Sequence, residues 1–136
     1  MENLSNISVI RDVLTRHGFS FSKGLGQNFL INPTVCPRMA ESGNAQPGWG
    51  MIEIGAGVGV LTAELARRAD KVVCIEIDSR LLPILDETLA EFDNIKIVNE
   101  ELTSLMGGGT AKLSMANNGP TVVMMVVSCA SITVST

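Results

Sequence analysis

Residues 53–59 read Glu-Ile-Gly-Ala-Gly-Val-Gly, and this stretch decides the fold of the chain. A short apolar run, 51–54, leads into the glycines, and a helical pattern follows them. A second apolar run, 72–75, then ends in Glu76. The pattern predicts a strand, a glycine turn, a helix and a second strand with an acid at its end.

A unit of this kind binds a cofactor that contains adenosine, because the glycines admit the ligand and the acid accepts hydrogen bonds from the ribose hydroxyls. The glycines are Gly55, Gly57 and Gly59, a G-x-G-x-G spacing that differs from the G-x-G-x-x-G of dinucleotide-binding proteins. Glu53 precedes them, where an acid suits a ligand that carries a sulfonium and an ammonium and no pyrophosphate. This combination resembles motif I of the class I methyltransferases, and the resemblance favours S-adenosylmethionine over a nicotinamide cofactor. Without the acid at 76, an ordinary strand-to-helix turn would explain the glycines equally well.

Strands and helices alternate through the middle of the chain, an order that predicts a parallel α/β sheet with flanking helices. Binding sites in such sheets lie at the carboxyl ends of the strands. Gly55, Glu76 and Glu101 follow the first, second and third predicted strands. The predicted elements are helices over 5–17, from 32, over 59–68 and from 79, and strands over 51–54, 71–75, 95–98 and 122–127.

The predicted helices have recognisable ends and apolar faces. Ser5 is predicted to cap the first helix and His17 to end it, where an imidazole interacts favourably with the helix dipole. Asn32 is predicted to cap the second helix, before Pro33. The predicted buried faces consist of Ile7, Ile10 and Leu14 in the first helix, Val35 and Met39 in the second, and Leu81, Leu85, Leu89 and Phe92 in the last.

The composition limits the kind of protein. The chain has 136 residues, 46% of them hydrophobic, which suits one domain with a core. A net charge of −4 does not suggest a free-standing nucleic-acid-binding protein. Three separate cysteines and one histidine make a zinc site unexpected and fit a reducing compartment. The start of the chain lacks a signal pattern and the longest apolar run is too short for a bilayer, so we expect a cytoplasmic protein.

Residues 23–30 read Lys-Gly-Leu-Gly-Gln-Asn-Phe-Leu, shortly before the glycine motif. With this string, the chain resembles the ribosomal RNA adenine dimethyltransferases from about residue 7 to about residue 105. It resembles more loosely the erythromycin-resistance methyltransferases, which act on large-subunit rRNA. The resemblance implies a Rossmann-like class I sheet that binds S-adenosylmethionine, incomplete in this chain. It also implies dimethylation of adenine N6 in small-subunit (16S) rRNA, with that rRNA or its precursor particle as partner and without a metal.

The resemblance also assigns roles to individual residues. It implies that residues of the 23–30 string contact the methionine end of the cofactor. It also implies that the acid after the second strand binds the ribose, and that residues after the second and third strands contact the adenine. Glu101 stands where the family has an aspartate. The implied cofactor-binding residues are Gln27, Asn28, Leu30, Glu53, Gly55, Gly57, Glu76, Ile77 and Glu101.

The last part of the chain departs from the family. The fourth strand of the family ends in Asn-Leu-Pro-Tyr, which holds the target adenine, whereas residues 128–131 read Ser-Cys-Ala-Ser and the chain has no tyrosine. We therefore divide the sequence into 1–50 (N-terminal helices and cofactor-lining loop), 51–105 (the S-adenosylmethionine-binding core) and 106–136 (a divergent tail). Three hypotheses remain: a dimethyltransferase, a cofactor-binding fragment of that enzyme without activity, and a nicotinamide-binding fragment.

Overall fold

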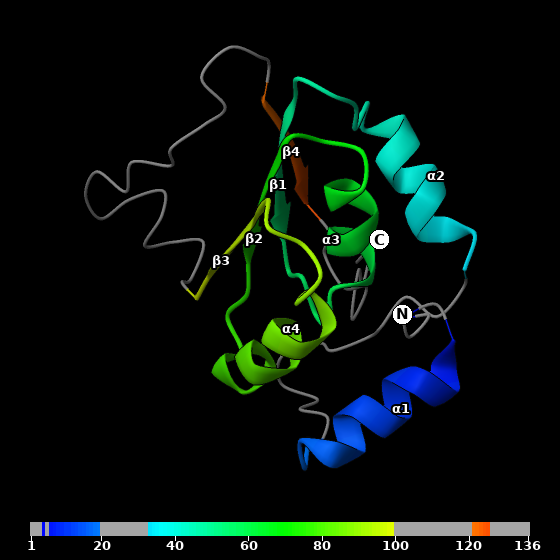
Figure 1. Cartoon of the computed structure of the whole chain (residues 1–136), viewed down its shortest axis with the longest axis vertical. Helices are drawn as coiled ribbons and strands as arrows, with labels where there is room; N and C mark the ends of the chain where they lie inside the picture. Colours follow the sequence, from blue (N-terminus) through cyan, green and yellow to red (C-terminus); the bar gives the residue numbers. More distant parts are fainter. Residues whose placement is uncertain (1–3, 5, 20–32, 100–120, 126–136) are drawn as a thin grey trace, which may run out of the picture.

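Four parallel strands form one sheet in the order β3-β2-β1-β4 (Figure 1). The computed structural model describes residue 4 and residues 6–19, 33–99 and 121–125. The strands begin and end close to the predicted positions, and β4 starts and ends slightly earlier than predicted. Their bounds are β1 Gly50–Ile54, β2 Lys71–Ile75, β3 Ile95–Val98 and β4 Thr121–Met125.

Helix α3 connects β1 to β2, and helix α4 connects β2 to β3. From β1 the chain passes outward through β2 to β3, and β4 then pairs with the other side of β1. Strand order reverses between β1 and β4, and ligands of open α/β sheets bind at the carboxyl ends of the strands beside such a reversal. The helices are α1 Ile7–Arg16, α2 Val35–Ser42, α3 Val60–Ala66 and α4 Leu82–Thr88, the last preceded by a 3₁₀ turn, η2 Ser79–Leu81.

The main core lies between the sheet and these helices, and Figure 1 shows α1, α2 and α3 along the same side of the strands. Met51 of β1 pairs with Val72 of β2, and both side chains are buried in that core. The intervening Ile52 and Val73 belong to a separate buried cluster, as expected when alternate side chains of a strand point to opposite faces. Glu53, two positions from Met51, therefore points to the helices.

The first helix differs from its prediction at the start. Asn6, not Ser5, is the N-cap, and its Oδ1 accepts a hydrogen bond from the Ser8 N–H at 3.0 Å. Ile7 is 40% exposed because it lies in the first turn, ahead of the part of α1 that contacts the core. Val13 takes its place beside the predicted Ile10 and Leu14, giving the i, i+3, i+4 stripe of a narrow helix contact.

The second helix begins at Val35, after a turn at 33–34, and Thr34 occupies the N-cap position without a side-chain cap bond. The predicted cap, Asn32, lies outside the described residues. Met39 packs partly buried against the core as predicted, Val35 is half-buried at the start of the helix, and the fully buried residues are the small Cys36 and Ala40. Helix α2 packs against a neighbouring helix, α3.

The last helix is close to its prediction. Leu81, Leu85 and Leu89 are buried as predicted, and Ile84 joins them. Phe92 lies beyond the end of α4 and packs half-buried against the core.

Candidate functional site

The turn after β1 requires its three glycines. Gly55, Gly57 and Gly59 have φ angles of 85°, 61° and 88°, all in the left-handed region that side chains with a Cβ rarely adopt. The Gly55 N–H donates to the Ile75 carbonyl at 2.8 Å, which ties the turn to the end of β2. Every second residue of this turn therefore has a positive φ angle, which explains why every second residue is a glycine.

Glu76 is fixed at the end of β2 by two backbone amides. The Gly57 N–H donates to Oε2 at 2.8 Å, and the Asp78 N–H donates to Oε1 at 2.9 Å. The residue is only 5% exposed. A carboxylate oxygen has room for a second hydrogen bond, so each oxygen can still accept one from a ligand. The structure thus brings the predicted acid against the predicted glycine turn.

Ile77 follows Glu76 and is 50% exposed, the most exposed of the large hydrophobic residues in the described ranges. Asn99, directly after β3, donates through Nδ2 to the carbonyl of Glu76 at 2.7 Å and to that of Ile77 at 3.2 Å. This amide links the ends of β2 and β3. The sequence analysis missed Asn99, although a polar residue directly after a strand that ends at the site was a usable signal.

Glu53 lies beneath this site, on the side of the sheet that faces the helices. It is 1% exposed, and the Thr62 hydroxyl of α3 donates to its Oε2 at 2.7 Å. Burial raises the pKa of Glu53 to about 8, the Thr62 hydrogen bond opposes this shift, and the negative charge of Glu76 adds to it. Glu53 is therefore predominantly protonated at neutral pH and joins β1 to α3.

The two described cysteines are buried core residues. Burial raises the pKa of the Cys74 thiol to about 12 and that of the Cys36 thiol to about 11, so both are neutral thiols at physiological pH. Within the described ranges, no group of histidine, cysteine, aspartate and glutamate side chains could hold a metal ion.

The other predicted cofactor residues, Gln27, Asn28, Leu30 and Glu101, lie outside the described residues, so their roles stay predictions. Asp78 is the N-cap of the 3₁₀ turn η2, and its Oδ1 accepts a hydrogen bond from the Arg80 N–H at 3.1 Å. His17 is the C-cap residue of α1, and its Nε2 is hydrogen-bonded to Glu87 of α4, a partner that the sequence did not predict.

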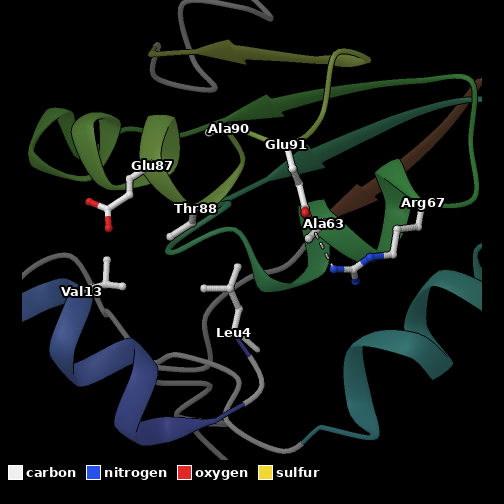
Figure 2. Close-up of a pocket in the computed structure, with 8 residues that line it drawn as sticks. All are labelled: Leu4, Val13, Ala63, Arg67, Glu87, Thr88, Ala90 and Glu91. Atoms are coloured by element: carbon white, nitrogen blue, oxygen red, sulfur yellow. Dashed lines mark ion pairs between the residues drawn. The ribbon is translucent and has the colours of Figure 1, made fainter. Parts of the chain in front are cut away.

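A pocket of about 330 Å³ lies elsewhere, between α1, α3 and α4 (Figure 2). None of the cofactor residues predicted above lines it. Its polar groups already have partners within the chain: Glu87 bonds Arg16, Thr88 donates to the Val58 carbonyl, and Arg67 pairs with Glu91. Leu4, Val13, Ala63, Arg67, Glu87, Thr88, Ala90 and Glu91 line it.

Comparison with known proteins extends these observations. The family model described as "Ribosomal RNA adenine dimethylase" matches residues 18–106. Ribosomal RNA small subunit methyltransferase A of Bacillus cytotoxicus is 50% identical over 102 residues, and that of Bacillus mycoides is 47% identical over 102 residues. Each alignment covers 75% of this chain and 35% of the relative, so the chain spans about 35% of the length of these curated relatives.

Solved structures give the same result for the fold. The structure of the 23S rRNA methyltransferase ErmE aligns with a TM-score of 0.52 and 42% identity over 54% of this chain and 30% of that one. The tRNA (m1A58) methyltransferase TrmI from Aquifex aeolicus aligns with a TM-score of 0.53 and 20% identity, over 67% of this chain and 37% of that one, and shows the fold alone. The sheet is that of class I S-adenosylmethionine-dependent methyltransferases. The match over residues 18–106 and the 50% identity to a curated relative show that the chain belongs to the ribosomal RNA adenine dimethylase family.

Proposed function

We propose that this chain binds S-adenosylmethionine at the carboxyl ends of β1 and β2. The observation that carries the proposal is the Glu76 carboxylate, held by the Gly57 amide and the Asp78 amide with one acceptor position left on each oxygen. Two adjacent acceptors match the two adjacent hydroxyls of a ribose. The exposed Ile77 beside them offers an apolar surface to an adenine ring.

The remaining contacts follow from the family resemblance. In this proposal Gln27, Asn28 and Leu30 contact the methionine end of the cofactor, and Glu101 contacts the adenine amino group. Glu53 supports the glycine turn from below through Thr62 of α3.

We further propose that the family reaction is methyl transfer to adenine N6 in small-subunit rRNA, or in its precursor particle, in the cytoplasm. The cofactor supplies an electrophilic methyl group on a sulfonium. The residues of the chain hold and orient it, since in-line transfer depends on the geometry of approach. The curated relatives named above are small-subunit rRNA methyltransferases, and ErmE, a 23S rRNA methyltransferase, makes the large-subunit reaction the alternative.

A second candidate function is cofactor binding without methyl transfer. The observation that favours it lies after β4, which ends at Met125. The chain continues Val-Val-Ser-Cys-Ala-Ser over 126–131, without the Asn-Leu-Pro-Tyr with which the family holds the target base. Extruding a base from its stack costs free energy, so it needs such a receiving site.

Methyl incorporation separates the two functions. The purified chain is incubated with radiolabelled S-adenosylmethionine and small-subunit particles that lack the dimethyladenosines, with deproteinised large-subunit rRNA in parallel. Transfer to the particles that Glu76→Ala abolishes supports the dimethyltransferase, and transfer to the large-subunit rRNA supports the alternative substrate. Cofactor binding with transfer to neither RNA supports the binding protein without activity.

A further inference from the structure

The glycine turn is held by the end of α4 as well as by the end of β2. Thr88, the last residue of α4, donates through Oγ1 to the Val58 carbonyl at 2.9 Å, between the second and third glycines of the turn. A Cβ at Gly59 would lie 3.0 Å from Leu89 Cδ2 and 3.2 Å from Leu85 Cδ2. The hydrogen bond therefore crosses a close-packed contact between α4 and the turn.

The Thr88 hydroxyl makes a bond that differs from the usual one of a threonine in a helix. Such a threonine ordinarily donates to a carbonyl one turn earlier in its own helix, as Thr15 of α1 does to the Arg11 carbonyl at 2.7 Å. In α4 the corresponding carbonyl, that of Leu85, is 3.5 Å from Thr88 Oγ1, whereas the Val58 carbonyl is at 2.9 Å. The single hydroxyl proton is therefore directed to the glycine turn.

The Val58 carbonyl needs a partner from outside the following helix. Gly59 is the N-cap of α3, and its carbonyl accepts the first bond of that helix, from the Ala63 N–H at 2.9 Å. The carbonyl of Val58 precedes these helical bonds, and the residue is only 2% exposed. Because a buried carbonyl without a partner is unfavourable, the Thr88 bond fixes the orientation of the peptide group between Val58 and Gly59.

We propose that Thr88 is a positioning residue for cofactor binding, whose hydroxyl holds the glycine turn in the conformation in which the Gly57 amide fixes Glu76 for a ribose. Gly57 directly precedes the residue that Thr88 holds, and its N–H donates to Glu76 Oε2 at 2.8 Å. When the turn is released, Glu76 keeps only the Asp78 amide. The inference rests on the proposed function, in which both oxygens of Glu76 accept the ribose hydroxyls.

A valine tests the hydroxyl while keeping the shape of the side chain. Thr88→Val retains the β-branch and removes the donor to the Val58 carbonyl. We expect binding of S-adenosylhomocysteine, measured by calorimetric titration, to weaken by about three- to tenfold, the size of one hydrogen bond. The 2′,3′-dideoxy analogue of this ligand lacks both ribose hydroxyls, so we expect its affinity to stay within about twofold of the wild-type value.

Two further variants distinguish positioning from a general loss of stability. Thr88→Ser retains the hydroxyl and is expected to bind S-adenosylhomocysteine within about twofold of the wild type. Thr15→Val removes the ordinary helical threonine bond in α1 and is expected to leave both affinities unchanged. Circular dichroism and a thermal melt verify that each full-length variant is folded at the titration temperature, so a lower unfolding free energy alone does not change the measured affinity.

The inference is overturned if Thr88→Val binds S-adenosylhomocysteine as the wild type does, if both ligands weaken equally, or if Thr88→Ser is as weak as Thr88→Val. A folded wild-type chain that does not bind S-adenosylhomocysteine contradicts the proposed function instead. In that case hydrogen exchange of the Gly57 amide tests the contact without a ligand, because that amide is bonded to Glu76. Exchange about three- to tenfold faster in Thr88→Val than in Thr15→Val supports positioning of the turn by Thr88, and equal exchange overturns it.

Discussion

Glu53 is the residue whose surroundings differ most from those of an exposed carboxylate. Its burial raises its pKa from the ordinary 4.5 to about 8. Between these values the folded chain holds a proton that the unfolded chain has released, so stability falls as pH rises through this window and levels off above it. The pKa of Glu87 is lowered, first by its hydrogen bond to His17. This group therefore makes the folded chain more stable as pH rises through the acid range.

We predict that Glu53→Gln flattens this pH dependence. The glutamine is neutral at every pH and its oxygen can still accept the Thr62 hydrogen bond. Urea unfolding between pH 5 and 9 measures the effect, and the difference between variant and wild type isolates Glu53 because Glu87 is present in both. A wild type that becomes more stable between about pH 5 and 8 relative to Glu53→Gln would contradict the assignment.

Gly59 and Gly48 allow the cost of adding a side chain to be compared at two positions with the same backbone conformation. Both have a left-handed φ, of 88° and 85°, but a Cβ at Gly59 would lie 3.0 Å from Leu89 Cδ2, whereas at Gly48 it would meet open space. We predict that Gly48→Ala costs about 1–2 kcal/mol of unfolding free energy from backbone strain alone. Gly59→Ala adds an overpacking cost of about 1–3 kcal/mol, measured by urea unfolding. Equal losses would show that Leu85 and Leu89 move aside freely.

At this scale the sequence predicted those residues whose chemistry is specific to the motif. The glycine spacing predicted the left-handed turn because few other residue types fit it, and the structure brings the predicted acid at 76 against that turn. Thr62, Thr88 and Asn99 were not predicted, because their roles depend on which side chains of other elements lie within hydrogen-bond distance. Periodicity along one element carries no such information.

Strand β3 has an asparagine at each end, and the two serve different purposes. At the amino end, Asn94 Nδ2 donates to the carbonyls of Ala66 at 2.8 Å and Ala69 at 3.0 Å, which closes the end of α3. At the carboxyl end, Asn99 makes the equivalent pair of bonds to the backbone of Glu76 and Ile77. Neither the Asn94 contacts nor the Asn99 contacts were predicted from the sequence.

We predict that Asn94→Ala and Asn99→Ala separate stability from binding. Loss of two hydrogen bonds at a half-buried helix end should cost Asn94→Ala about 1–2 kcal/mol of unfolding free energy, with the affinity for S-adenosylhomocysteine unchanged. Asn99→Ala should weaken that affinity, because the carbonyls of Glu76 and Ile77 lose the amide that ties them to the end of β3. Equal affinity in the two variants, measured on folded protein, would contradict the division.

Helix faces were harder to predict than the existence of the helices. Strands β2 and β3 match their predicted bounds because short β-branched runs end at clear turn signals. The face of α2 was predicted only in part: Met39 packs against the core, but apolar periodicity did not single out the small residues Cys36 and Ala40, which are buried. Ile7 was wrong because apolar spacing cannot show how far a neighbouring element extends.

On the scale of the whole molecule, the strand order places the glycine turn at the reversal of the sheet, the position at which open α/β sheets bind ligands. With β2 and β4 on opposite sides of β1, the turn after β1 lies beside the reversal of the sheet, where the backbone is accessible to a ligand. The sequence predicted the parallel sheet from the alternation of elements. The pairing of β4 with β1 is a long-range contact that no local pattern reports.

Within the ranges the structure describes, no helix has the length and apolar character to cross a membrane.

Calorimetric titration of S-adenosylhomocysteine into the full chain tests the central claim most directly. Glu76→Ala is the test variant, and Glu41→Ala, which removes an exposed carboxylate on α2, is the control. We predict saturable binding by the wild type and by Glu41→Ala, and none by Glu76→Ala, because the ribose loses both acceptors. Equal binding by Glu76→Ala, or no binding by a wild type shown to be folded, would contradict the assignment of the site.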